Sequence, residues 1–145
     1  MAENFATTAD LYRLSGELPP EDDAYPASDG RSKDATDCRA RIARMFGRDM
    51  NEAPEVAWES AAGFFRERQL RLIADAVAQV LSLRPADRIP FVAAGAGHFL
   101  VPELARRFGC RADDFAALAP TRDAVRRKTG ICAPAVAVAL LAALG

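Results

Sequence analysis

The sequence is short of the residues that carry most metal and nucleophile chemistry. It has one histidine, His98, and three cysteines, none of which forms a Cys-x-x-Cys pair. This argues against a zinc site and against a disulfide framework. Cys38, Cys110 and Cys132 are odd in number and widely spaced, so we expect reduced, buried thiols in a cytoplasmic protein. No Ser-His-Asp order and no Cys-His pairing marks a nucleophile.

A charge surplus and a long hydrophobic run are also missing. The 19 Lys and Arg residues nearly balance the 20 Asp and Glu residues, which leaves a net charge of −1 and no basic footprint for nucleic acid. The N-terminus lacks the basic and apolar regions of a signal peptide. The longest apolar run, Ile131 to Leu144, is shorter than the roughly 20 residues that span a bilayer. We therefore expect a soluble protein with no nucleic-acid or membrane partner.

What is present is an ordinary globular composition. Half of the 145 residues are hydrophobic and 27% are charged, a profile typical of a folded chain rather than a disordered one. The length suits one modest domain with its own core, so we expect residues 1–145 to form a single domain.

The opening segment, residues 5–33, concentrates the polar chemistry. It is too polar, and too rich in proline and glycine, to be core, and exposed loops often carry function. Carboxylates suit Mg²⁺, while Arg and Lys suit phosphate. The alternative is a purely structural role: the segment is a solvated turn with helix caps, and Asp10 only stabilises the first turn of a short helix over 9–14. The candidate site residues of this segment are Thr7, Thr8, Asp10, Asp29, Arg31 and Lys33.

Three prolines between residues 17 and 29 exclude a regular helix or central strand, so this stretch is expected to be a surface loop and a possible flap. Asp29-Gly30 is a turn signal. Arg31 and Lys33 follow it directly, and a planar guanidinium with a compact ammonium group suits a diphosphate clamp. The alternative is an ordinary basic loop.

Apolar spacing predicts three longer helices. In the first, residues 35–46, an inward stripe of Cys38, Ile42, Met45 and Phe46 leaves Arg39, Arg41 and Arg44 on the outer faces. The second runs over 54–83 with one broad apolar face and Trp58 as a packing anchor. The third, 133–144, is apolar all round and is expected to be buried.

A turn at 84–87 precedes a short strand over 89–94, and a helix over 98–108 follows it. Between strand and helix lie Gly95 and Gly97. A strand, a glycine turn and a helix bring backbone N–H groups to a phosphate or nucleotide, although the same residues also make a plain tight turn. The third glycine of the dinucleotide fingerprint is replaced by Leu100. His98 stands at this turn, and we leave it outside the catalytic set.

Four separated motifs occur in an order that resembles a known family. They are ATTADLYRLSGELP, SDGRSK, FVAAGAGHFLVPELARRFG and CAPAVAVALLAALG, and together they extend over nearly all of the chain. The sequence resembles the C-terminal half of hydantoinase/oxoprolinase-like proteins of tetrahydromethanopterin-linked one-carbon metabolism. This group includes the synthase of the methanofuran core. The resemblance implies an α/β fold, specifically a helix-dominated portion of an actin-like ATPase (ribonuclease-H-like) fold with few strands. It also implies an upstream half with an Asp-x-Gly-Gly phosphate loop, which nothing here matches.

The resemblance implies a transferase that joins a furan-methyl diphosphate to the phenol of γ-glutamyl-tyramine and releases diphosphate. Asp10 and Asp29 are then expected to serve as catalytic base or to hold Mg²⁺. Arg31 and Lys33 are expected to bind the diphosphate of the small-molecule substrate.

Thr7 and Thr8 are expected to supply hydroxyl or backbone contacts in the same site. Gly95 and Gly97 fall at the adenosine-side motif of the superfamily, which favours a ligand-facing role for both.

Two other functions remain open. One is an ATP-dependent hydrolase or kinase of the hydantoinase/oxoprolinase kind. The other is a non-catalytic binding or regulatory half-protein. The one expected strand cannot form a sheet alone, so we expect a partner, either the N-terminal half of the same protein or a second copy. By itself the chain is expected to be inactive.

Overall fold

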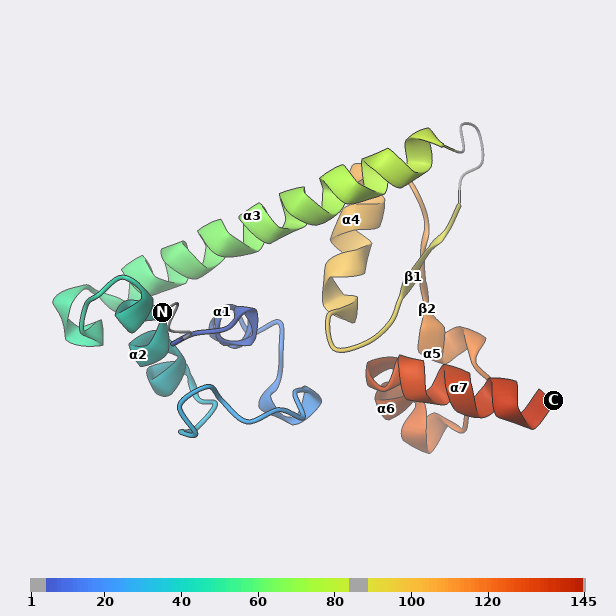
Figure 1. The fold of residues 1–145 in the computed structure, drawn as a ribbon, viewed down its shortest axis with the longest axis horizontal. Helices are drawn as coiled ribbons and strands as arrows, with labels where there is room; N and C mark the ends of the chain where they lie inside the picture. The colour runs from blue at the N-terminus through green and yellow to red at the C-terminus, as the bar shows by residue number, and fades with distance from the viewer. Residues whose placement is uncertain (1–4, 84–88, 145) are drawn as a thin grey trace. The chain divides into compact units, whose positions relative to one another are not determined.

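We describe the protein from a computed structural model, which describes residues 5–83 and 89–144 (Figure 1). The chain divides into two compact units, Met1–Ile73 and Ala74–Gly145. The single domain expected for residues 1–145 stays a prediction beside this division. The turn predicted at 84–87 lies outside the described residues.

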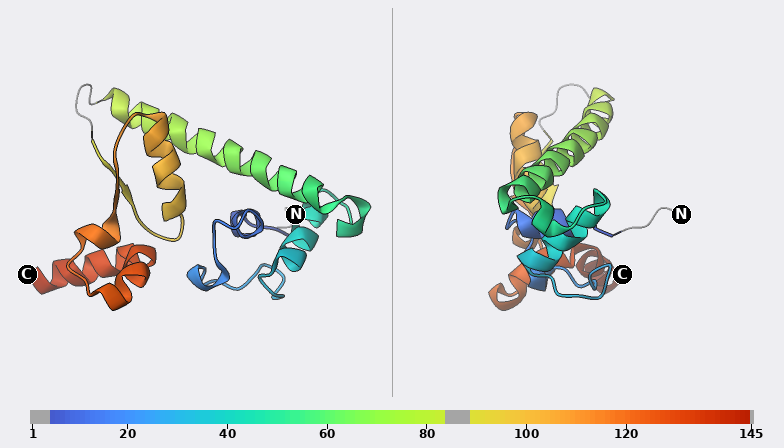
Figure 2. Two further views of the ribbon diagram at one scale, coloured as in Figure 1. Left: turned by 180° about the vertical axis from the view of Figure 1, so that it is seen from behind. Right: turned by 90° about the vertical axis from the view of Figure 1, so that its left-hand side faces the viewer.

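In its described residues, 5–73, the first unit is built from three α-helices. They are α1 (Thr8–Leu14), α2 (Ala35–Met45) and the first part of α3 (Glu55–Ser82), joined by loops with short 3₁₀ turns at Pro20–Asp22 and Met50–Glu52. Both views in Figure 2 show α3 as one continuous helix. Helices α2 and α3 occur close to the ranges that the apolar spacing predicts, and α1 lies close to the short capped helix expected over 9–14.

The core of this unit forms around Ile42, Ala43 and Trp58, which are 1%, 0% and 5% exposed. Five partly buried residues pack against them, namely Ala6, Leu11, Leu14, Met50 and Ala53. The indole N–H of Trp58 donates a hydrogen bond to the Met50 carbonyl at 2.9 Å, so the ring is oriented as well as buried. The predicted packing role of Trp58 is confirmed.

Local chemistry sets the ends of α1 and α2. The backbone N–H of Thr7, which precedes α1, donates to the Asp10 carboxylate at 2.9 Å. Asp34 precedes α2 and accepts a hydrogen bond from the Asp37 N–H at 2.8 Å. Gly16 and Gly47 follow the two helices with φ of 75° and 66°, a left-handed conformation that glycine adopts without a steric penalty.

The predicted faces of α2 are partly wrong. Cys38 and Ile42 are buried as expected, but Met45 and Phe46 are 51% and 48% exposed. Arg41, expected on the surface, is 0% exposed. The physical reason is that two carboxylates and a thiol lie within hydrogen-bonding reach of its guanidinium, so burial leaves the charge paired.

The broad apolar face expected along α3 is also largely uncovered in the described chain. Trp58, Ala62 and Leu70 are its buried residues. Phe64 and Leu72 are 66% and 60% exposed.

The second unit contains a small parallel β-sheet. Strand β1 (Phe91–Ala93) leads through a 3₁₀ turn (His98–Leu100) and α4 (Val101–Arg107) into β2 (Ala112–Asp114). The strands pair in parallel from Phe91–Ala112 to Ala93–Asp114. The β1 strand confirms the predicted one, but β2 was not predicted because its three residues, Ala-Asp-Asp, carry no apolar alternation. A helix-dominated α/β fold with few strands is therefore observed.

Four short elements complete the second unit after β2. They are α5 (Phe115–Leu118), a 3₁₀ turn (Asp123–Val125), α6 (Arg126–Ile131) and α7 (Ala133–Leu144). Figure 1 shows α5, α6 and α7 close to one another at the end of β2. The expectation that α7 is buried is wrong: of its described residues only Ala133 is buried, and Leu141 is 70% exposed.

Two smaller expectations can be compared with the structure. Cys38 is buried as predicted, Cys110 is partly buried and Cys132 is exposed, so the expectation of a buried thiol is wrong at Cys132; all three are free thiols. Within the described ranges, no single helix has the length and apolar character to cross a membrane. The pair Asp123–Ile131 and Ala133–Leu144, bent by 112°, meets that test only when taken together.

Candidate functional site

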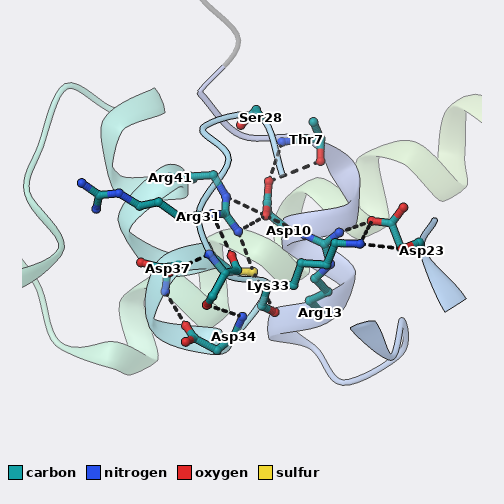
Figure 3. A network of polar contacts seen from close by, with 12 residues as sticks. Thr7, Asp10, Arg13, Asp23, Ser28, Arg31, Lys33, Asp34, Asp37 and Arg41 are labelled. Atoms are coloured by element: carbon teal, nitrogen blue, oxygen red, sulfur yellow. Dashed lines mark hydrogen bonds and ion pairs between the residues drawn. The ribbon is translucent and has the colours of Figure 1, made fainter. Parts of the chain in front are cut away.

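Asp10 on α1 and Arg41 on α2 form a buried ion pair in the first unit (Figure 3). The Arg41 Nε and Nη2 atoms lie 2.9 Å and 2.7 Å from Asp10 Oδ1. The other carboxylate oxygen, Oδ2, accepts a hydrogen bond from the Thr7 backbone N–H at 2.9 Å. Both side chains are only 1% exposed. Asp10 is therefore fully engaged by the protein itself.

Arg41 also reaches the loop that carries Asp29. Its Nη1 lies 3.0 Å from Asp29 Oδ1 and 3.1 Å from the Ser32 carbonyl oxygen. The Asp29 carboxylate additionally accepts the Arg31 backbone N–H at 3.1 Å, which closes the turn predicted at Asp29-Gly30. Because its side chain is 21% exposed, Asp29 is the carboxylate of this pair that faces solvent.

The shared guanidinium sets the electrostatics of the group. Burial alone raises the pKa of Asp10, but the hydrogen bonds and charge of Arg41 outweigh it, so the pKa lies below the ordinary value of 3.8. The pKa of Asp29 is lowered in the same way, against desolvation, by the Arg31 backbone N–H and by Arg41. Burial and the charge of Asp10 raise the pKa of the Cys38 thiol. Both carboxylates are thus ionised at neutral pH while the thiol stays protonated.

A second ion-pair group lies next to the first. Asp23, in the proline-rich loop, pairs with Arg13 at the end of α1, and its Oδ2 lies 3.9 Å from Lys33 Nζ. Arg13 Nη1 in turn lies 3.2 Å from Asp10 Oδ1. Figure 3 shows the continuous network that results, with Lys33 and Arg13 both directed toward Asp23.

The structure brings together most, but not all, of the predicted residues of the opening segment. Thr7, Asp10, Asp29 and Lys33 belong to the network, whereas Thr8 is an exposed residue of α1. Arg31 is exposed, and its guanidinium makes no hydrogen bond or ion pair with the described part of the chain. The two cations expected to act as one clamp therefore do not converge on a common partner.

Gly95 and Gly97 lie in the second unit, at the turn after β1. Gly95 has a φ of 78° and its N–H donates to the Gly130 carbonyl at 2.8 Å. A cavity of about 430 Å³ lies beside this turn and is lined by His98, Arg126 and Gly130, among others. Because the Gly95 N–H is already bonded to Gly130, it does not point freely into that cavity.

The candidate site residues chosen from the sequence do not include three members of the network, Arg13, Asp23 and Arg41. Arg41 lies three positions after Cys38 and next to Ile42, so it borders the predicted inward stripe of α2. Its charge argues for the surface unless its partners are known. Arg13 lies three positions after Asp10, which is a weaker signal of the same kind.

The residues fit a directly bound Mg²⁺ poorly at Asp10, because Thr7, Arg13 and Arg41 already bond to its two oxygens. Across the described ranges, no three His, Cys, Asp or Glu side chains gather into a set that suits a metal ion. Arg41 supplies the positive charge between Asp10 and Asp29 instead. The Mg²⁺ expectation stays a prediction.

The fold and this network define a helix-dominated α/β chain whose opening loop presents one solvent-facing carboxylate within a cluster of ion pairs. The family model named hydantoinase/oxoprolinase matches residues 2–143, nearly the whole chain. The protein belongs to the hydantoinase/oxoprolinase family. A search of curated proteins finds no match to it.

Proposed function

We propose that the complete protein is a transferase of methanofuran-type cofactor synthesis. It joins a furan-methyl diphosphate to the phenol of γ-glutamyl-tyramine and releases diphosphate. Membership of the hydantoinase/oxoprolinase family provides the frame for this proposal. The motifs ATTADLYRLSGELP and SDGRSK, which resemble the tetrahydromethanopterin-linked group, provide the detail. The proposal includes an actin-like fold for the complete protein.

One observation carries the proposal. Asp29 and Lys33, four residues apart on the SDGRSK motif, both have partly exposed side chains, at 21% and 23%. The turn at Asp29 and the contact of Lys33 with Asp23 fix an acidic and a basic group on the same loop. Attack by a phenol on a diphosphate ester needs both: a proton acceptor and a cation for the leaving group.

The residues serve the reaction as follows. The phenol oxygen attacks the furan methylene carbon, the carbon–oxygen bond to diphosphate breaks, and diphosphate leaves with the electron pair. The phenolic proton passes to the Asp29 carboxylate. A carboxylate of lowered pKa is adequate as base because the phenol becomes far more acidic as its new bond forms. Lys33 stabilises the charge that develops on diphosphate.

The proposal also includes a partner, which is the N-terminal half of the same protein or a second copy. Apolar side chains that remain exposed support it, among them Phe64 at 66% and Leu144 at 85%. Covering such surface is the usual role of an interface.

A coupled assay tests the proposal. The full-length protein is incubated with furan-methyl diphosphate, γ-glutamyl-tyramine and Mg²⁺, and the ether product is measured by mass spectrometry. Asp29→Asn keeps the shape of the side chain and removes the base, so we expect the product to fall by roughly 10²-fold or more. Asp75→Asn, at an exposed position of α3, changes the net charge equally and serves as the control.

The family match by itself favours a second candidate, an ATP-dependent hydantoinase or oxoprolinase-like hydrolase or kinase. ATP hydrolysis coupled to opening of a hydantoin or lactam, without ether product, decides for it. A folded full-length protein with neither activity leaves the non-catalytic binding or regulatory half-protein. Equal product from Asp29→Asn and Asp75→Asn contradicts the assigned role of Asp29.

A further inference from the structure

The guanidinium of Arg13 is buried but only partly bonded. Its side chain is 3% exposed, Nη1 lies 3.2 Å from Asp10 Oδ1, and Nη2 bonds to Asp23. The third nitrogen, Nε, is buried with no hydrogen-bond partner among the described residues. An unsatisfied donor on a buried cation is costly, so its persistence indicates a role for the missing partner.

The planar guanidinium of arginine indicates what kind of group would bond to the free Nε of Arg13. A carboxylate or phosphate that binds an arginine side-on accepts from two nitrogens at once, and Nε with Nη2 form one such edge. Asp23 engages this edge at Nη2 alone, while its other oxygen accepts the Tyr25 backbone N–H at 3.1 Å. The aspartate therefore uses half of a two-point anion site.

Lys33 is the second cation that contacts Asp23. Its Nζ donates to the Asp23 backbone carbonyl and lies 3.9 Å from Asp23 Oδ2. With Asp23 present, the cluster has as many carboxylates as cations: Asp10, Asp23 and Asp29 against Arg13, Lys33 and Arg41. Without Asp23 it keeps one uncompensated positive charge, located at Arg13 and Lys33.

The segment that carries Asp23 can move away from Arg13 and Lys33 with little disruption of the fold. It lies between two buried anchors, Asp22 at 7% and Ala27 at 8% exposure, and Tyr25 within it is 80% exposed. Asp23 belongs to no helix or strand. Moving it breaks few contacts other than those to Arg13, Lys33 and the Tyr25 N–H.

From these observations we infer that Arg13 and Lys33 form an anion subsite that Asp23 occupies in the resting protein. A phosphate or diphosphate group displaces Asp23, engages both Nε and Nη2 of Arg13, and releases residues 23–26. The ligand class rests on the proposed function, because a diphosphate ester is the proposed substrate. Asp23 is thus an internal competitor of the substrate anion.

Binding of inorganic diphosphate, measured by isothermal titration calorimetry on the full chain, tests this inference. Asp23→Asn removes the competing charge and is expected to lower the Kd roughly tenfold, since the binding-competent state becomes more populated. Asp113→Asn removes a carboxylate paired with Arg111 in the other unit and makes the same change in net charge. A gain in Asp23→Asn that is absent from Asp113→Asn, and lost on adding Arg13→Met, supports the subsite. Equal or no gain in the two single variants overturns it.

A measurement on the unmodified protein guards against a variant that fails to fold. Hydrogen–deuterium exchange of the Tyr25 amide is expected to accelerate at saturating diphosphate, because its acceptor on Asp23 moves away. Unchanged or slower exchange, or no binding at all, overturns the inference. Neither readout needs the furan substrate or turnover. Failure of the coupling assay with displacement intact therefore contradicts the proposed function alone.

Discussion

Replacing Arg41 by methionine tests whether the Asp10–Arg41–Asp29 group holds the first unit together. Methionine keeps the length and apolar stem of the side chain but removes every donor. Asp10, 1% exposed, then loses its two shortest side-chain contacts, at 2.7 Å and 2.9 Å, and keeps those to Thr7 and Arg13. Breaking a buried ion pair costs about 3–5 kcal/mol, and because Arg13, 3.2 Å from Asp10 Oδ1, still compensates part of the charge, we expect the lower end of that range. That is a large part of the stability of a typical domain.

The free energy of unfolding is measured in urea through the fluorescence of Trp58, which is the only tryptophan of the sequence and is 5% exposed in the core of this unit. Arg44→Met, at an exposed position on the same helix, is the matched control and is expected to change stability by less than about 0.5 kcal/mol. Adding Asp10→Asn to Arg41→Met removes the stranded charge, so we expect it to restore part of the loss.

The pH dependence gives the sharper criterion. Without Arg41, the hydrogen bonds and charge of its guanidinium no longer lower the pKa of Asp10 while burial still raises it, so we expect a higher folded-state pKa than in the unmodified protein. The folded variant then takes up its proton at higher pH than the unmodified protein does, so the variant's deficit shrinks as pH falls toward about 4. A deficit below about 1 kcal/mol at neutral pH, or one that is the same at both pH values, refutes the reasoning.

Three further outcomes are expected. In the unmodified protein the lowered pKa of Asp10 stabilises the fold fully above the ordinary value of 3.8, and this contribution is lost as pH falls through the lower folded value; acid titration of the unfolding free energy checks the direction. Glu17→Gln breaks the two-point contact with Arg66, whose hydrogen bonds lower the pKa of Glu17, and is expected to cost about 1 kcal/mol in urea unfolding. A thiol reagent is expected to label exposed Cys132 first and to label buried Cys38, whose pKa is raised, only on unfolding; peptide mapping that finds Cys38 labelled first contradicts this.

Helical periodicity and glycine stops predict the helices of this chain well, because α2 and α3 follow the spacing rules and end near Gly47 and residue 83. The same rules do not find β2, whose residues carry no strand pattern. They also place α7 in a core, because an apolar composition predicts burial but does not identify the segments that would pack against the helix. Packing partners distant in sequence decide such cases.

In the candidate site, too, some residues can be predicted from the sequence and others depend on contacts between distant segments. Composition alone selects Asp10, Asp29 and Lys33, and the structure joins them in one network. It does not select Arg41, because the partners that make its burial tolerable lie 31 and 12 residues earlier in the chain. A single sequence gives no means of pairing charges across such separations.

The position of Arg41 has a consequence for how the sequence can vary. Its guanidinium bonds to carboxylates on two separate segments and to the Ser32 carbonyl, so no replacement at one position leaves the others satisfied. Positions 10, 29 and 41 are therefore expected to covary among homologues, changing together or not at all. A lineage that loses the arginine has to neutralise the buried carboxylate at position 10 in the same step or pass through a poorly folded intermediate.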